Sequence, residues 1–167
     1  MMPAYFAISP DGKRVAAGAQ TGAAFVFTAE GETQRLTGHT AAIRSIGFAP
    51  DGKRVYFLSG RADPQQIFNL SLEGGEPVQV TKSPLDVNAF ILSADGKTFA
   101  FAAEVFPDCK EADTLTCTEK RLAELAKKKT TGKLYDQLLF RHWDTWKDGR
   151  RSHVFTTPVA GGAMKDL

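Results

Sequence analysis

The chain contains three copies of one short signature, each centred on an Asp-Gly pair. The copies span Ile8–Arg14, Phe48–Arg54 and Leu92–Thr98, and their aspartates lie 40 and then 44 positions apart. Asp-Gly supplies the positive-φ positions of a tight hairpin turn, so a repeat of this length predicts four-stranded β-propeller blades. Three blades fall short of the roughly 4–8 that close a propeller. We therefore expect the chain to be part of something larger.

The alternation of apolar and polar residues between the turns predicts four strands in each repeat. We assign residues 1–40 to a first blade, 41–84 to a second, and 85–103 with 151–167 to a third, incomplete blade. In the third blade the strand pattern breaks after its second strand and resumes at His153–Gly162, which mirrors Gln66–Gly75. The sequence thus predicts an all-β fold, a partial β-propeller of about three four-stranded blades with an insertion at 104–150.

The 47 residues of this insertion differ in composition, with ten Lys/Arg and nine Asp/Glu. Thr116 and Glu119 fit a capping box, with the threonine at the N-cap. An apolar stripe follows at helical spacing: Leu122, Leu125 and Ala126. Lys127–Lys129 would fall in the last turn, so we predict a helix over about 117–131 and interpret the lysines as its solvated end. A nucleic-acid patch would interleave more basic residues with aromatic ones.

Composition excludes several classes of function. Hydrophobic residues make up 43% of the 167 residues and charged residues 24%, as in an ordinary globular domain. A net charge of +2 is too small to indicate binding to nucleic acid or to an anionic membrane. No apolar stretch approaches the 18 or so residues that a membrane span needs. The start, Met1–Phe6, is typical of a strand rather than a signal peptide, so we expect the chain to begin inside a longer protein.

The two cysteines, Cys109 and Cys117, lie eight positions apart in a charged, loop-like stretch. Either they form a local disulfide or they are two free thiols. Neither lies in an apolar run where a buried thiol would belong, which favours the disulfide. Such a bridge would contribute roughly 2.5 kcal/mol and requires an oxidising compartment. A zinc site would need further Cys or His ligands, so we expect no metal.

No complete catalytic machinery is evident. His142, Asp144 and Ser152 are close in sequence, but the chain has no G-x-S-x-G nucleophile elbow, so we expect no triad. No phosphate-binding glycine loop is present, and we predict no cofactor. His39 follows a glycine as in WD-type blades, where such a histidine holds strands together, so we interpret it as structural.

The stretch around His142 is the most distinctive in the chain. Its motif residues are Arg141, His142, Trp143, Asp144 and Trp146. On physical grounds we expect the polar members to pair with one another or with backbone groups, while the tryptophans pack against the blade.

Taken together, these residues resemble a known family. The Asp-Gly-Lys turns resemble the propeller repeats of the TolB-type translocation proteins and of the prolyl oligopeptidase family of serine peptidases. The insertion favours the second group, because Glu104–Cys109, Cys117 and the stretch from Tyr135 to Phe155 resemble the N-terminal propeller of bacterial dipeptidyl-peptidase and acylaminoacyl-peptidase-like members. The likeness covers essentially the whole chain.

The resemblance implies a secreted or periplasmic parent whose propeller gates and positions oligopeptide substrates for an α/β-hydrolase domain. This chain would be a non-catalytic portion of it, and no catalytic residue carries over. Glu104, at the rim of a blade, is the candidate for gripping a substrate's free amino group, although it is one carboxylate rather than an adjacent pair. The alternative is a stand-alone TolB- or WD-like module that binds protein partners. Open blade edges would also allow self-association.

Overall fold

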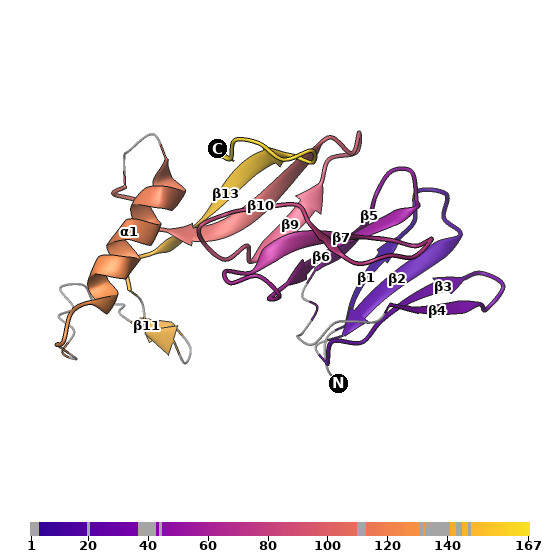
Figure 1. Cartoon of the computed structure of the whole chain (residues 1–167), viewed down its shortest axis with the longest axis horizontal. Coiled ribbons are helices and arrows are strands. Elements are labelled where there is room, and N and C mark those ends of the chain that lie inside the picture. Colours follow the sequence, from indigo (N-terminus) through magenta and orange to yellow (C-terminus); the bar gives the residue numbers. More distant parts are fainter. Residues whose placement is uncertain are drawn as a thin grey trace.

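The computed structural model describes residues 4–19, 21–36, 43, 45–109, 113–130, 132, 141–142, 145–146 and 148–167. His39, Trp143 and Asp144 lie outside these residues. Within them, the strands form three four-stranded antiparallel sheets and one two-stranded sheet, with a single helix beside the third sheet (Figure 1).

The first two sheets follow the chain without interruption, as the repeat predicts. The first consists of β1 (Ala4–Ile8), β2 (Arg14–Ala19), β3 (Ala24–Thr28) and β4 (Thr33–Leu36). The second consists of β5 (Ile46–Phe48), β6 (Arg54–Ser59), β7 (Gln66–Ser71) and β8 (Val78–Gln79).

The third sheet has the same order but a long connection in its middle. It consists of β9 (Ala89–Leu92), β10 (Thr98–Val105), β13 (Arg151–Pro158) and β14 (Lys165–Asp166). Between β10 and β13 lie the helix α1 (Thr114–Ala126) and the hairpin of β11 (Arg141–His142) and β12 (Thr145–Trp146). Because β10 pairs with β13 up to Val105 and Arg151, Glu104 belongs to the sheet rather than to the inserted segment.

Each Asp-Gly signature forms the same turn between the first two strands of its sheet. In the first sheet the Gly12 amide donates to the Ser9 carbonyl at 2.9 Å, and the Lys13 amide donates to Asp11 Oδ1 at 3.1 Å. Gly12 has a φ of +71°, and Gly52 and Gly96 have φ values of +65° and +68°. Such values suit glycine because a side chain would clash with its own backbone there. The repeated sequence is therefore a repeated backbone conformation.

Two hydrophobic clusters join the sheets face to face. The cluster between the first and second sheets contains Ala16, Val26, Ile43, Phe57 and Phe68, all less than 9% exposed. The cluster between the second and third sheets is larger, and it extends to Leu115 of α1: its bulkiest members are Tyr56, Phe99, Phe101 and Phe155. Tyr56 and Phe99 meet edge to face with ring centroids 4.9 Å apart, a favourable geometry for aromatic rings. Successive sheets are thus stacked as blades.

The helix differs from its prediction at both ends. Asp113, not Thr116, is the N-cap, and its side chain accepts a hydrogen bond from the Thr116 amide at 3.3 Å. The capping box prediction was therefore wrong, because an aspartate three positions earlier satisfies the free amides first. The helix ends at Ala126 with Lys127 as its C-cap, so Lys128 and Lys129 follow the helix rather than occupying its last turn.

Candidate functional site

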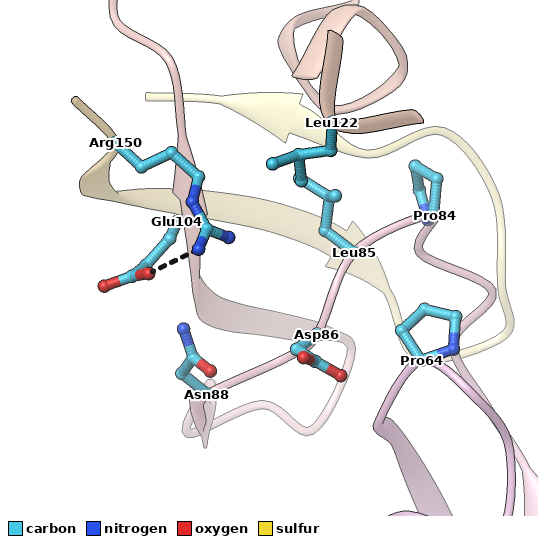
Figure 2. Close-up of a pocket in the computed structure, with 8 residues that line it drawn as sticks. All are labelled: Pro64, Pro84, Leu85, Asp86, Asn88, Glu104, Leu122 and Arg150. Atoms are coloured by element: carbon cyan, nitrogen blue, oxygen red, sulfur yellow. Dashed lines mark ion pairs between the residues drawn. The ribbon is translucent and has the colours of Figure 1, made fainter. Parts of the chain in front are cut away.

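A pocket of about 240 Å³ lies at the end of the blades opposite the Asp-Gly turns. It gathers residues from five segments of the chain (Figure 2): the loop before β7, the link from β8 to β9, the end of β10, α1, and the residue just before β13. Its lining residues are Pro64, Pro84, Leu85, Asp86, Asn88, Glu104, Leu122 and Arg150. The second and third blades and the inserted helix therefore build it together.

Glu104 and Arg150 point toward each other across one side of the pocket (Figure 2). Arg150 Nη2 lies 3.8 Å from Glu104 Oε2, a loose ion pair, whereas Arg150 Nε lies 2.7 Å from Asp148 Oδ2. The Arg150 amide also donates to Asp148 Oδ1 at 3.1 Å. Asp148 therefore holds the guanidinium firmly, and the Glu104 side chain stays 51% exposed. Glu104 keeps carboxylate capacity for another cation.

Asp86 supplies a second carboxylate from the link between the second and third blades. Its Oδ1 accepts the Gln65 amide at 2.7 Å, and the Gln65 side chain donates to the Val87 carbonyl at 2.8 Å. This pair of bonds fastens the link to the loop before β7. The Asn88 amide donates to the Ala102 carbonyl at 2.8 Å, which continues the link into the third sheet. The Gln65 amide thus positions the Asp86 side chain, while no residue in the described part of the chain donates a hydrogen bond to the other carboxylate oxygen.

Helix α1 forms the apolar wall through Leu122, which lies over Leu85 in Figure 2. Residues that directly follow β10 form hydrogen bonds and an ion pair with the helix and hold it in place. The buried Thr118 hydroxyl accepts the Phe106 amide at 3.1 Å. Arg121 bonds both carboxylate oxygens of Asp108, at 2.8 and 2.7 Å, and stacks over the Phe106 ring at 4.1 Å. The guanidinium beside Asp108 lowers the pKa of that carboxyl below its ordinary value.

Cys109 and Cys117 form the predicted disulfide. Cys117 lies in the first turns of α1, and Cys109 lies four residues beyond the end of β10. The bridge therefore ties the start of the helix to the strand that carries Glu104. Together with Thr118 and Arg121, it fixes the helix as a wall of the pocket.

The lining charges favour a cationic ligand. Two carboxylates, Asp86 and Glu104, line the pocket together with one guanidinium, Arg150, which is already paired with Asp148. A primary ammonium group pairs well with carboxylates, and several carboxylate oxygens can share its three protons. The prolines and leucines of the lining offer apolar surface beside these charges. The arrangement suits a ligand that carries an ammonium group next to a small apolar group.

Of the predicted site residues, the structure places Glu104 in this pocket. Arg141 pairs with Trp146, and His142 with Thr145, in the β11–β12 hairpin. Trp143 and Asp144 of the same motif are outside the described residues. Ser152 pairs with Glu104 in the backbone register of the third sheet.

Sequence reasoning missed Asp86, Arg150 and Leu122 as members of one site. Arg150 could have been found by extending the repeat. The likeness of 153–162 to 66–75 indicates how β13 pairs with β10, and this pairing places residue 150 beside the end of β10. Asp86 gave no such signal, because it lies in a link whose path depends on the packing of two blades.

Two further properties of the described residues bear on the site. No group of three or more His, Cys, Asp or Glu side chains among them is arranged to hold a metal ion. No helix in the described part of the chain is long and apolar enough to cross a membrane.

The comparisons with known proteins agree with the resemblance drawn from the sequence. The chain is 26% identical over 165 residues to dipeptidyl-peptidase 5 of Porphyromonas endodontalis. The alignment covers 93% of this chain but only 22% of the peptidase, so the chain spans about a fifth of that relative's length. No protein-family model matches the chain.

Solved structures confirm the predicted fold class. A putative TolB from Agrobacterium tumefaciens superimposes on 99% of the chain with a TM-score of 0.64 and 20% identity. TolB from Acinetobacter baumannii superimposes on 99% with a TM-score of 0.65 and 18% identity. The chain covers 49% and 32% of those two proteins. Its fold is that of a partial TolB-like β-propeller.

Proposed function

We propose that this chain is a non-catalytic propeller portion of a secreted or periplasmic serine exopeptidase of the dipeptidyl- or acylaminoacyl-peptidase type. Its role is to gate and position oligopeptide substrates for an α/β-hydrolase domain of the longer protein. The observation that carries the proposal is the likeness to dipeptidyl-peptidase 5 over 93% of the chain. The Cys109–Cys117 disulfide supports an oxidising compartment.

In this proposal, the residues that line the pocket position the amino-terminal end of the substrate. An exopeptidase must distinguish the free amino terminus of a peptide from any internal residue, and the ammonium group is what differs. Glu104 and Asp86 supply carboxylates for that group, and Leu85 and Leu122 supply apolar surface for the first side chain. Arg150, held by Asp148, remains beside them as a donor for a peptide carbonyl.

The test is binding of a short peptide with and without its terminal charge. We expect trialanine to shift the backbone NMR signals of residues 86–88, 104 and 150 in the purified chain, and N-acetyl-trialanine to leave them unchanged. Glu104→Gln and Asp86→Asn should each weaken binding roughly tenfold, as expected for loss of one charge-assisted hydrogen bond. Glu73→Gln is the matched control, because Glu73 forms an exposed ion pair with Lys53 on the second blade.

Two results would contradict the proposal. Equal binding of the free and acetylated peptides would mean that the pocket does not recognise a terminal ammonium, and would favour the alternative of a protein-binding module. Release of product from dipeptidyl or aminoacyl chromogenic substrates by this chain would contradict its non-catalytic role.

A further inference from the structure

Arg150 lies between two carboxylates and contacts them unequally. Its Nε lies 2.7 Å from Asp148 Oδ2, whereas its Nη2 lies 3.8 Å from Glu104 Oε2. The first distance is that of a charge-assisted hydrogen bond, and the second is too long for a hydrogen bond. Glu104 belongs to the lining of the pocket and Asp148 does not. The guanidinium therefore makes its short bond to the carboxylate outside the pocket lining.

The backbone around Asp148 holds this carboxylate in place. Asp148 Oδ1 accepts the Arg150 amide at 3.1 Å, which closes a tight turn. Gly149 in this turn has a φ of +96°, and the point where a side chain would begin lies 3.7 Å from the Phe106 ring. Phe106 is itself buried, and its amide donates to the Thr118 hydroxyl of α1. The position of Asp148 is thus set by its own turn, which packs on a fixed part of the chain.

The pair between Glu104 and Arg150 is loose although the two side chains are close enough to form a full ion pair. Glu104 pairs with Ser152 in the register of β10 and β13, and Arg150 lies two positions before Ser152. Long side chains at such diagonal positions across two strands can reach each other. A guanidinium that was free to turn could present two parallel N–H groups to Glu104, the bidentate geometry that arginine and carboxylates form. Figure 2 shows the pair in its open arrangement.

A closed pair would reduce the capacity of the pocket for cations. The lining contains two acidic side chains, Asp86 and Glu104, and one basic side chain, Arg150. If both oxygens of Glu104 accepted hydrogen bonds from the guanidinium, its charge would be neutralised locally. Asp86 would then be the carboxylate of the lining that remained for a ligand. The bond between Arg150 and Asp148 therefore affects what the pocket can bind.

We propose that Asp148 is a positioning residue that keeps Arg150 from closing on Glu104, so that the Glu104 carboxylate stays open to the ammonium group of a ligand. This role rests on the proposed function of the pocket, and it assigns control of Glu104 to a residue outside the pocket lining. An incoming ammonium replaces only the loose contact of Arg150 Nη2. The guanidinium stays bound to Asp148 during this exchange.

The first test uses Asp148→Asn in the purified chain without ligand. The asparagine oxygen can still accept the Arg150 amide, so the turn is kept while the charge that holds the guanidinium is removed. We expect the carbon-13 NMR signal of the Glu104 carboxyl to shift in this variant, because the guanidinium closes on it. In an Arg150→Gln background, Asp148→Asn should leave the signal unchanged. An unshifted Glu104 signal in the single variant would overturn the proposal.

Asp51→Asn is the matched control for this measurement. Asp51 also accepts a backbone amide, that of Lys53 at 2.9 Å, and also bonds a guanidinium, that of Arg54 at 2.9 Å. It lies in an Asp-Gly turn, at the end of the blades opposite the pocket. This variant should leave the Glu104 signal where it is in the wild type. A shift as large as that of Asp148→Asn would mean that the signal reports a general loss of charge, and would also overturn the proposal.

The second test is the affinity for trialanine in a double-mutant cycle. Asp148→Asn should weaken binding roughly fivefold, the upper end for a partly exposed ion pair. In the Arg150→Gln background the same change should alter the affinity by less than about twofold, because no guanidinium is left to close on Glu104. Equal weakening in both backgrounds would show that Asp148 acts through its turn or its own charge, which contradicts the proposal. If the wild-type chain does not bind trialanine, the proposed function fails, and the carboxyl signal alone decides the role of Asp148.

Discussion

The two ends of the blades differ in kind. At one end, three nearly identical Asp-Gly turns stack on one another through Pro50 against Gly96 and Arg14 against Gly52. At the other end, no two connections are alike: six residues separate β6 from β7, whereas 45 residues with a helix separate β10 from β13. The pocket lies at the variable end. The repeated end therefore sets the spacing of the blades, and the variable end carries the candidate site.

The largest effect at the repeated end is expected when a side chain is added to a turn glycine that contacts the turn of the preceding blade. In Gly96→Ala, the new methyl would lie 2.2 Å from the Pro50 ring and would sit at a φ of +68°. We expect a loss of about 2–4 kcal/mol in unfolding free energy, from the backbone conformation and the overpacking together. Gly12→Ala has the same backbone penalty but open space, so its loss should be only about 1–2 kcal/mol. Urea unfolding of both variants measures the difference in unfolding free energy. Equal losses would show that the contact between Gly96 and Pro50 does not affect stability.

Removing the Cys109–Cys117 disulfide tests the variable end. Replacing Cys109 and Cys117 together by serine should lower the unfolding free energy by roughly 2.5 kcal/mol, from the loop entropy of the unfolded chain. Amide hydrogen exchange should accelerate in α1 and leave β1 to β4 unchanged, because the bridge acts only on the helix and the end of β10. Uniform acceleration across all three sheets would show that the two ends are not separable.

The smallest expected effect concerns the aspartate of each turn and the pH at which the chain unfolds in acid. The Ser93 hydroxyl and the Lys97 amide, which donate to Asp95, lower the pKa of that carboxyl below its ordinary value. A carboxyl with a lowered folded pKa adds stability above about pH 4, and this stability is lost as pH falls through the folded pKa. Ser93→Ala should therefore move the acid unfolding midpoint to slightly higher pH.

The second turn provides the matched control for this prediction. It has Ala49 where the other turns have serine, and its Asp51 bonds Arg54 Nη2 at 2.9 Å instead. Ala49→Ser should move the acid midpoint to lower pH, the direction opposite to Ser93→Ala. Identical shifts from both variants would mean that the serine hydroxyl has no role in these turns.

The fold could be predicted from the sequence because the structure of the repeated end depends on residues that are close together in the chain. An Asp-Gly turn needs only its own residues to form, and alternating strands beside it specify their own pairing. The last strand of the third sheet, β14 (Lys165–Asp166), lies within residues 151–167, which the sequence assigned to the third blade. The disulfide was also predictable, since two cysteines eight positions apart in a charged stretch have few other roles.

The site was only partly predictable because its parts converge through packing. Glu104 stood out by its place at the rim of a blade, but Asp86 reaches the pocket only because its link is fastened to Gln65. Leu122 was identified as part of an apolar stripe, without any indication of which surface the stripe covers. The start of the helix was misplaced because Asp113 competes with Thr116 for the same free amides.

The long connection between β10 and β13 has a consequence for how the chain folds. Joining these strands closes a segment of 45 residues, against six for the equivalent pair β6 and β7. The extra loop entropy is about 1.8 kcal/mol at the moment the strands meet. The first two sheets contain only short connections, so they can form early and offer the Tyr56 surface as a template. The third sheet would then assemble last, and the aromatic residues of its inner face would stay in water the longest during folding.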